Sequence, residues 1–372
     1  MVVDRDADRV KPAGTVADRQ RRPAVVVALC RCVRRCVVVS GRLCAAVGSG
    51  TFGGRCAGGD LRRAGGTPDG RCGDLLRGQE LAAAATNLGE TMVRVTAIAA
   101  QKGGATKTAL ACNVGPLLAL AGRRTLMIDL DQQADLTARF GCTPETLDYS
   151  MVDVLAPRNN VPIAEAIVRG VRGVDGLDLL ASDIRASGLE EQLTGVSFRE
   201  ALLAAQIKLV ADEYDEIVID CPPSLGVLTM NGLVAADQAV VPVNMQDRAA
   251  LNGVEQLLET VLTIQRQTPK DAVRLRAIVC NRVTEAAVAF RRNALKLEAL
   301  QAQGVPVART RLKEARAWHN AGAEDLPLVM YAPNSDAARN VRELMVELWP
   351  DVTFAYMSTA AAGLRSWRRA AA

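Results

Sequence analysis

The sequence predicts an α/β fold: a mostly parallel, doubly wound sheet with helices on both faces. Short, near-continuous apolar runs alternate with amphipathic stretches from residue 93 onward, which is typical of buried parallel strands covered by helices. An apolar content of 49% over 372 residues can fill a sizeable core. No Pro/Gly-rich linker and no internal repeat interrupt this part. It therefore fits one domain better than two.

The elements of this domain follow one another in a regular order. A β-rich run at 93–99 precedes a predicted helix at 108–121, which Gly122 ends. Further strands are predicted at 125–130, 177–180, 216–220, 238–243, 275–280 and 305–307. Amphipathic helices are predicted at 198–210, 253–265 and 285–301. The domain is predicted to span residues 92–350, followed by a tail at 351–372.

Residues 1–91 differ from the rest in composition and patterning. They contain six of the ten cysteines, fourteen arginines and several glycine pairs, without a sustained helical or strand period. Such a segment cannot bury enough apolar surface to offset its ordering entropy, so we predict disorder. A metal site at Cys30, Cys32 and Cys36 is the alternative, but paired spacing and a nearby histidine are missing. A further hypothesis is that Met92 is the natural start and the segment is a misassigned extension.

Composition excludes several classes of protein. Aromatic residues make up only 3% of the chain, which disfavours a base-stacking surface. No uninterrupted apolar run reaches the length of a transmembrane helix. Residues 1–91 hold 15 Lys and Arg against 9 Asp and Glu, whereas the remainder holds 30 against 32. The predicted domain is therefore not a globally basic nucleic-acid binder.

The segment between the first strand and the first helix, Gln101 to Thr108, has the composition of a phosphate-binding loop. Its two glycines let backbone N–H groups turn inward, and the helix start adds partial positive charge. Lys107 stands where a phosphate-binding lysine is expected and Thr108 where a Mg²⁺-binding hydroxyl is expected. The standard G-x-x-x-x-G-K-[ST] pattern is not matched in full. An ordinary glycine-containing connection is therefore the alternative for this segment alone.

Two acidic residues also follow strands of the predicted sheet. Asp131 comes directly after the second strand and Asp220 ends a later one. Ligands of open parallel sheets bind at the carboxyl ends of the strands. A single Asp in such a place is commonly a turn former or a helix cap. Two beside a phosphate loop indicate one nucleotide site.

These motifs resemble those of the ParA/MinD family of deviant Walker A ATPases, and most closely the ParA partition proteins. Residues 102–108, KGGATKT, are similar to the family's K-G-G-x-G-K-T, and residues 128–135 to its D-x-D-P-Q-G-N segment. The stretch YDEIVIDCPPS at 214–224 is similar to its D-x-x-x-x-D-x-P-P-S stretch. The resemblance spans about residues 93–350 and implies a P-loop NTPase fold.

The resemblance implies a role for each matching residue. ATP would bind at Gly103, Gly104, Ala105, Thr106, Lys107, Thr108 and Ala109, with the base near Asn281. Thr108 and Asp220 would hold Mg²⁺, Asp131 would position the attacking water, and Lys102 would reach the partner's nucleotide across an ATP-bound homodimer. For Asn281, a strand-end turn residue is an equally good interpretation.

The sequence also departs from the family pattern. Thr106 replaces the glycine before the P-loop lysine, and a β-branched residue resists positive φ. Gln132 and Ala134 replace the proline and glycine of D-P-Q-G, and Pro116 interrupts the predicted helix. Because the lysines and acids remain, we expect Mg²⁺-ATP binding with slow, partner-stimulated hydrolysis. A non-hydrolysing nucleotide-binding or scaffold protein is the alternative.

By the same resemblance, the ATP-bound dimer would bind DNA without sequence preference and act in plasmid or chromosome partitioning. Its partner would be a centromere-binding ParB-like protein, and it would be located in the cytoplasm on the nucleoid. Two basic clusters are candidate contacts, with a solvated polar face as the alternative: Arg291, Arg292 and Lys296, and Arg309, Arg311 and Lys313. A MinD-like membrane helix is disfavoured, because residues 364–369 offer only a thin apolar face.

Overall fold

The computed structural model describes residues 37–38, 44–45 and 93–354, apart from positions 103, 105, 249 and 268–272. The chain forms two compact units, Met1–Ala83 and Ala84–Ala372. In the first, β1 (Val37–Val38) pairs with β2 (Cys44–Ala45) in antiparallel orientation. The disorder predicted for 1–91 otherwise falls outside the described residues. So do the Cys30, Cys32 and Cys36 cluster and most of the predicted tail.

The second unit is built on a seven-stranded sheet in the order β5-β6-β4-β7-β3-β8-β9. Every neighbouring pair is parallel except the edge pair β5–β6, so the predicted mostly parallel sheet is confirmed. The strands are β3 (Arg94–Ile98), β4 (Thr125–Asp129), β5 (Ile167–Val168), β6 (Leu177–Leu180), β7 (Glu216–Asp220), β8 (Gln238–Asn244) and β9 (Arg274–Asn281).

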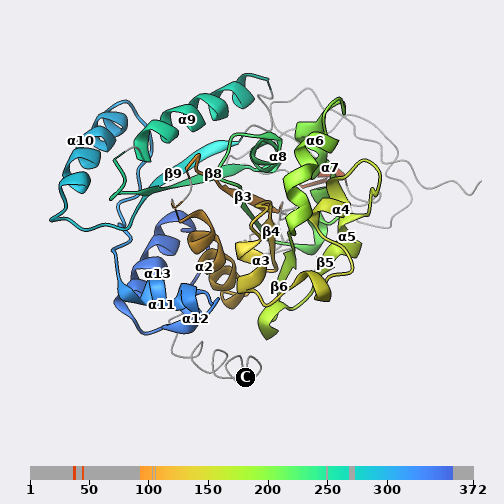
Figure 1. Ribbon diagram of the computed structural model, residues 1–372, viewed down its shortest axis with the longest axis horizontal. Helices are drawn as coiled ribbons and strands as arrows, with labels where there is room; N and C mark the ends of the chain where they lie inside the picture. The colour runs from red at the N-terminus through yellow and green to blue at the C-terminus, as the bar shows by residue number, and fades with distance from the viewer. Residues whose placement is uncertain are drawn as a thin grey trace, which may run out of the picture. The chain divides into compact units, whose positions relative to one another are not determined.

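Helices cover both faces of this sheet (Figure 1). The α-helices are α2 (Lys107–Leu120), α3 (Asp135–Arg139), α4 (Met151–Leu155), α5 (Ile163–Ala166), α6 (Leu189–Gln192), α7 (Leu202–Ile207), α8 (Val227–Ala235), α9 (Ala250–Gln267), α10 (Val288–Ala302), α11 (Arg316–Ala323), α12 (Leu328–Tyr331) and α13 (Asp336–Leu348). Short 3₁₀ turns lie at Pro144–Thr146, Val171–Gly173, Ile184–Gly188, Arg199–Ala201 and Ala211–Glu213.

The buried residues form two apolar clusters, one on each face of the sheet. Alternate side chains of a strand point to opposite faces, so Ile217 and Ile219 of β7 join one cluster and Val218 joins the other. The first cluster includes α4 and α7 to α10; the second includes α2, α12 and α13 (Figure 1). Helix α2 approaches β4 so closely that a Cβ at Gly115 would clash with Met127. Buried packing on two faces is what identifies the doubly wound arrangement.

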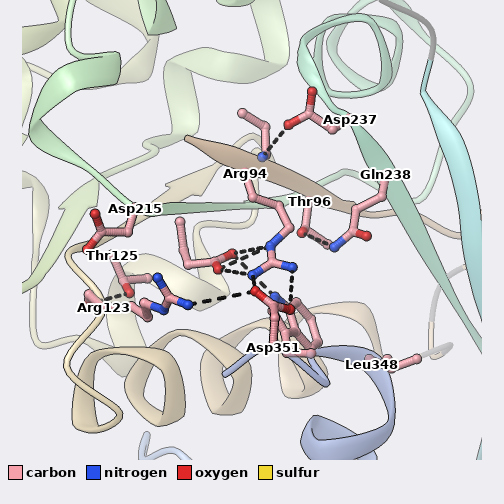
Figure 2. A network of polar contacts seen from close by, with 12 residues as sticks. Arg94, Thr96, Arg123, Thr125, Asp215, Asp237, Gln238, Leu348 and Asp351 are labelled. Atoms are coloured by element: carbon pink, nitrogen blue, oxygen red, sulfur yellow. Dashed lines mark hydrogen bonds and ion pairs between the residues drawn. The ribbon is translucent and has the colours of Figure 1, made fainter. Parts of the chain in front are cut away.

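Polar contacts connect the amino-terminal edge of the sheet to the segment that follows α13. Arg94, the first residue of β3, contacts Glu216 on β7 and Asp351 beyond α13 (Figure 2). The indole nitrogen of Trp349 donates to the same Glu216 carboxylate at 3.3 Å. Ion pairs therefore stabilise the amino-terminal ends of these strands, opposite the carboxyl ends where ligands of such sheets bind.

Two predicted elements differ from the structure. The predicted helix at 198–210 is a 3₁₀ turn followed by the shorter α7, because Phe198 has a left-handed conformation (φ 56°) that no right-handed helix accommodates. The predicted strand at 305–307 forms only an isolated bridge from Val307 to Ile278. Pro306, which has no N–H to donate, limits pairing there. Helix α2, in contrast, continues through Pro116.

Candidate functional site

The loop between β3 and α2 has two residues in the left-handed region. Gly104 has φ 75° and Thr106 has φ 65°. Glycine adopts this conformation freely, but for a β-branched residue it costs about 1–3 kcal/mol. Thr106 nevertheless takes the conformation that the glycine of the motif would take. The predicted ligands Gly103 and Ala105 lie outside the described residues.

Helix α2 begins at this loop without a side-chain cap. Thr106 is its N-cap residue but makes no capping hydrogen bond through its side chain, and the first turn has no acidic residue. Unpaired N–H groups and the helix dipole together favour an anion at such a terminus. Lys107, the first residue of the helix, is buried, with Thr108 and Ala109 following it. These predicted phosphate-binding residues thus share one helix start.

Two buried carboxylates stand side by side at the carboxyl ends of β4 and β7. Asp129 and Asp220 are partners in the register of the parallel pair, and both are inaccessible to water. Asp129 accepts hydrogen bonds from the amide of Asp131 and from the amide and hydroxyl of Thr137. Neither oxygen of Asp220 has a hydrogen bond of good geometry among the described residues, but the Thr108 hydroxyl and the Lys107 ammonium lie close enough to stabilise its charged form. Asp220 is therefore the less compensated of the two acids.

Burial changes the protonation of this pair. Burial raises the pKa of Asp129 to about 7, although its bonds to Thr137 and to the Asp131 amide act in the opposite direction. Burial and then the Asp129 carboxylate raise the pKa of Asp220 well above its usual range, and Thr108 and Lys107 oppose the rise. Two buried carboxylates this close do not both ionise readily without a cation. The Asp220 corner is thus arranged to receive positive charge.

The chemistry of this corner fits Mg²⁺ held together with phosphate. No group of three or more His, Cys, Asp or Glu side chains suited to a metal occurs in the described part of the chain. Mg²⁺ needs no such group when it keeps its waters and binds through one or two protein oxygens and a phosphate. Asp220, with two unpaired oxygens, and the nearby Thr108 hydroxyl provide those oxygens.

Asp131 also lies at this edge, where the sequence predicted it. Its side chain is buried, and one of its oxygens accepts from the amide of Gln133 at 3.0 Å. Its charge contributes to the raised pKa of Asp220, so the two carboxylates are near each other. Asp131, Asp220, Lys107 and Thr108 therefore come together around the start of α2.

Asn281, the predicted base-contacting residue, is buried at the end of β9 and bonded to the phosphate loop. Its amide nitrogen donates to the Thr106 hydroxyl, and its oxygen accepts from the amide of Arg282 at 2.7 Å. A glycine at position 106 would have no hydroxyl, so the threonine adds an acceptor that occupies one N–H of the Asn281 amide.

Lys102 contacts its own subunit. Its Nζ lies 2.5 Å from Oδ2 of Asp247, which follows β8, and both side chains are partly exposed. Sequence reasoning did not select Asp247. A polar residue just beyond the carboxyl end of the strand at 238–243 is the signal that could have indicated it.

The second predicted basic cluster lies against α10, the helix that carries the first. Arg291, Arg292 and Lys296 are exposed on α10. Arg309 and Arg311 line a cavity together with other α10 side chains, and the Arg311 guanidinium lies 5.5 Å from the ring centre of Phe290 on that helix. Lys313 is exposed beside them and lines the adjoining cavity with both arginines. The fold thus makes the clusters neighbours.

Comparisons with known proteins agree with this geometry. Residues 93–274 match a family model described as an AAA domain. The sporulation initiation inhibitor protein Soj of Bacillus subtilis is 37% identical over 181 residues, which cover 48% of this chain and 69% of Soj. The chain belongs to the ParA/Soj family of ATPases. The chromosome partitioning protein ParA of Caulobacter vibrioides is 37% identical over 171 residues, 45% of this chain and 62% of that protein.

Solved structures with the same fold include other ParA/MinD-type proteins. Cobyrinic acid a,c-diamide synthase of Mycobacterium smegmatis, with bound ADP and magnesium, is 31% identical with a TM-score of 0.57. It matches 69% of this chain and 96% of its own. The cell division ATPase MinD of Pyrococcus furiosus is 23% identical with a TM-score of 0.55, covers 69% of this chain and 100% of its own, and supports the fold alone. In the part of the chain that the structure describes, no helix is long and apolar enough to cross a membrane.

Proposed function

We propose that this chain is a ParA-like ATPase whose Mg²⁺-ATP site lies at the start of α2. The observation that carries the proposal is the buried Asp220 carboxylate, which has no hydrogen bond of good geometry among the described residues and has Thr108 and Lys107 beside it. A buried, unpaired acid is unfavourable unless a ligand compensates it. The relative solved with ADP and magnesium supports the same ligands here. We take residues 92–350 as the ATPase domain.

Each group of the site has a distinct task in this proposal. The first amides of α2 and the Lys107 ammonium bind the phosphates, and Thr108 and Asp220 hold the magnesium, Asp220 through water. The cation neutralises charge on the phosphate oxygens. Asp131 accepts a hydrogen bond from the attacking water and so orients it. Binding and orientation therefore come from separate residues.

Lys102 makes the activity depend on a second subunit. We infer that two ATP-bound copies pair so that the Lys102 ammonium of each reaches the other's phosphates, as an arginine finger does. The contact with Asp247 occupies Lys102 within one subunit, and pairing would exchange it for phosphate. Slow turnover in isolation and stimulation by a partner follow from this arrangement.

Partitioning of plasmid or chromosomal DNA is the biological role that we propose. The ParA protein of Caulobacter vibrioides, a chromosome partitioning protein by name, supports it. The ATP-bound dimer binds DNA without sequence preference, in the cytoplasm on the nucleoid, and a ParB-like protein stimulates its hydrolysis of ATP. The DNA contacts are the basic residues of two clusters: Arg291, Arg292 and Lys296 on α10, and Arg309, Arg311 and Lys313. Such binding weakens as salt rises, because phosphate contacts release counterions. A binding affinity that ignores both ATP and salt would contradict this role.

A non-hydrolysing scaffold is the second candidate, and the strained Thr106 favours it. A loop that bears strain, and whose threonine hydroxyl accepts a hydrogen bond from the Asn281 amide, binds nucleotide less well than a glycine loop. Turnover of ATP measured with and without DNA separates the two. Turnover that DNA raises supports the ATPase, and none under either condition supports the scaffold. A MinD-like membrane function would depend on residues 364–369, which lie outside the described residues.

Calorimetric titration of ATP into the full chain tests the site. Lys107→Ala is expected to abolish binding, because the other lysine of the loop, Lys102, is paired with Asp247 and does not replace the buried ammonium. Lys208→Ala, which removes an exposed lysine far along the chain, serves as the matched control. Asp131→Ala is expected to bind ATP but not to hydrolyse it. Equal ATP affinity of Lys107→Ala and the unmodified protein would exclude the site.

A further inference from the structure

The cavity lined by Arg309 and Arg311 lies between α10 and the segment that follows this helix, beside the edge strand β9. It encloses about 780 Å³, its open mouth included, which is within the usual range of small-molecule pockets. Phe290 and Leu297 of α10 and Cys280 of β9 are buried and form an apolar wall. An apolar wall next to a guanidinium group suits a ligand that has an apolar body and a negative charge.

The guanidinium of Arg311 lies directly at this wall. It is 5.5 Å from the centre of the Phe290 ring, and the described residues offer it no ion pair. Burial raises the pKa of the Cys280 thiol to about 11, and the charge of Arg311 opposes this rise, so the guanidinium is near Cys280 as well. The side chain of Arg309, in contrast, is 90% exposed and lies 3.6 Å from Glu347. Arg311 is therefore available to pair with an anion inside the cavity.

The other end of the cavity carries an acidic side chain. Glu298 and Gln301 line it from α10, and both are exposed. Glu298 lies about 12 Å further along α10 than Phe290, at the helical rise of about 1.5 Å per residue. Because the Glu298 carboxylate repels an anion and Arg311 attracts one, the two ends of the cavity orient a ligand that has one negative end.

We propose that this cavity binds an amphipathic monocarboxylate, such as a medium-chain fatty acid, with its carboxylate on Arg311 and its chain against Phe290 and Leu297. A charged hydrogen bond to a guanidinium is strong where apolar groups exclude water. Each methylene group of the chain that packs against the apolar wall adds to the affinity. A phosphate of DNA can pair with Arg311 from outside, but it has no apolar chain to fill the cavity.

Calorimetric titration of decanoate into the full chain tests the proposal. Arg311 is also a proposed DNA contact, so the titration uses neither DNA nor nucleotide, and its outcome does not depend on the ATP site. Decanoate is expected to bind at a saturable site. Decanol, which has the same chain without the charge, should bind at least tenfold more weakly, and so should hexanoate, which has a shorter chain. Absence of saturable decanoate binding would overturn the proposal.

Two pairs of variants locate the site. Arg311→Gln should bind decanoate at least tenfold more weakly and lose the preference for decanoate over decanol, whereas Arg274→Gln, at an exposed arginine that does not line the cavity, should bind like the unmodified chain. Ala294→Phe should fill the cavity and block decanoate, whereas Ala299→Phe adds the same ring at an exposed position of α10. Melting curves confirm that each variant is folded. Equal decanoate affinity in Arg311→Gln and the unmodified chain would overturn the carboxylate contact, even if Ala294→Phe fails to fold.

Glu298→Gln tests the orientation of the ligand. Decanedioate carries a second carboxylate that would approach Glu298, so the unmodified chain should bind it more weakly than decanoate. Glu298→Gln should raise the affinity for decanedioate and leave that for decanoate nearly unchanged. An equal effect of Glu298→Gln on the two ligands would contradict the proposed orientation.

Discussion

Strand β7 begins with one buried acid and ends with another, and their surroundings differ. Glu216 accepts from Arg94 and from the Trp349 indole (the network of Figure 2), whereas Asp220 has no such partner among the described residues. Burial raises the pKa of both carboxyls, and only at Glu216 does an arginine oppose it. Within five residues of one strand, one acid is paired with residues of the fold and the other is the acid that we propose holds the metal. Variants at the two ends should therefore affect different properties.

The largest effect is expected at the paired end. Glu216→Ala leaves the Trp349 indole unpaired and removes one partner of Arg94, and breaking a buried pair in this way costs about 3–5 kcal/mol. Urea unfolding at pH 7 measures the loss. Glu213→Ala, which breaks an exposed pair with Arg169, is the control and should cost at most about 1 kcal/mol. An equal free energy of unfolding for Glu216→Ala and Glu213→Ala would contradict the stabilising role of the Glu216 pair.

A smaller effect is expected at the loop beside Asp220. Thr106→Gly relieves a left-handed β-branched residue and frees the Asn281 amide, so the ATP affinity should rise by about tenfold, equivalent to ~1.4 kcal/mol. Thr106→Ala removes the hydroxyl but keeps a side chain in the left-handed region, and should gain less. Calorimetry with ATP measures both variants. An affinity in Thr106→Gly at or below that of the unmodified chain would show that the strain does not limit binding.

The smallest effect concerns pH at the paired end. Hydrogen bonds from Arg94 lower the pKa of Asp351, so its contribution to stability is present above about pH 4, the ordinary value, and disappears as the pH falls through the lowered pKa. Because Asp351 is half exposed, Asp351→Asn should cost at most about 1 kcal/mol at pH 7. The difference from the unmodified chain should narrow toward pH 3. A difference that widens on acidification would contradict the assignment.

Strand positions could be predicted well from the sequence. The strands at 177–180 and 216–220 have the predicted bounds, and α2 lies within one residue of its prediction, because short buried apolar runs and a glycine stop are local signals. Helix α13 was not predicted, and neither was the two-residue antiparallel edge strand β5. A strand of two residues is too short to show a period.

The site was predictable only where its residues end strands. Asp131, Asp220 and the loop before α2 share this local signature, so the sequence alone indicated them together. The bond from Asn281 to Thr106 joins residues 175 positions apart, and no local pattern indicates such a pair. The Lys102–Asp247 contact depends in the same way on how strands are ordered in the sheet.

The Mg²⁺ dependence of ATP affinity in Asp220→Asn tests the central claim most directly. In the unmodified chain, chelation of Mg²⁺ is expected to weaken ATP binding at least tenfold, because the cation links phosphate to the unpaired carboxylate. Asp220→Asn should remain folded, since it keeps the size of the side chain and removes a charge that burial already disfavours, and its ATP affinity should change little on chelation. A Mg²⁺ dependence in Asp220→Asn equal to that of the unmodified chain would contradict the claim that Asp220 is the acid kept for the metal.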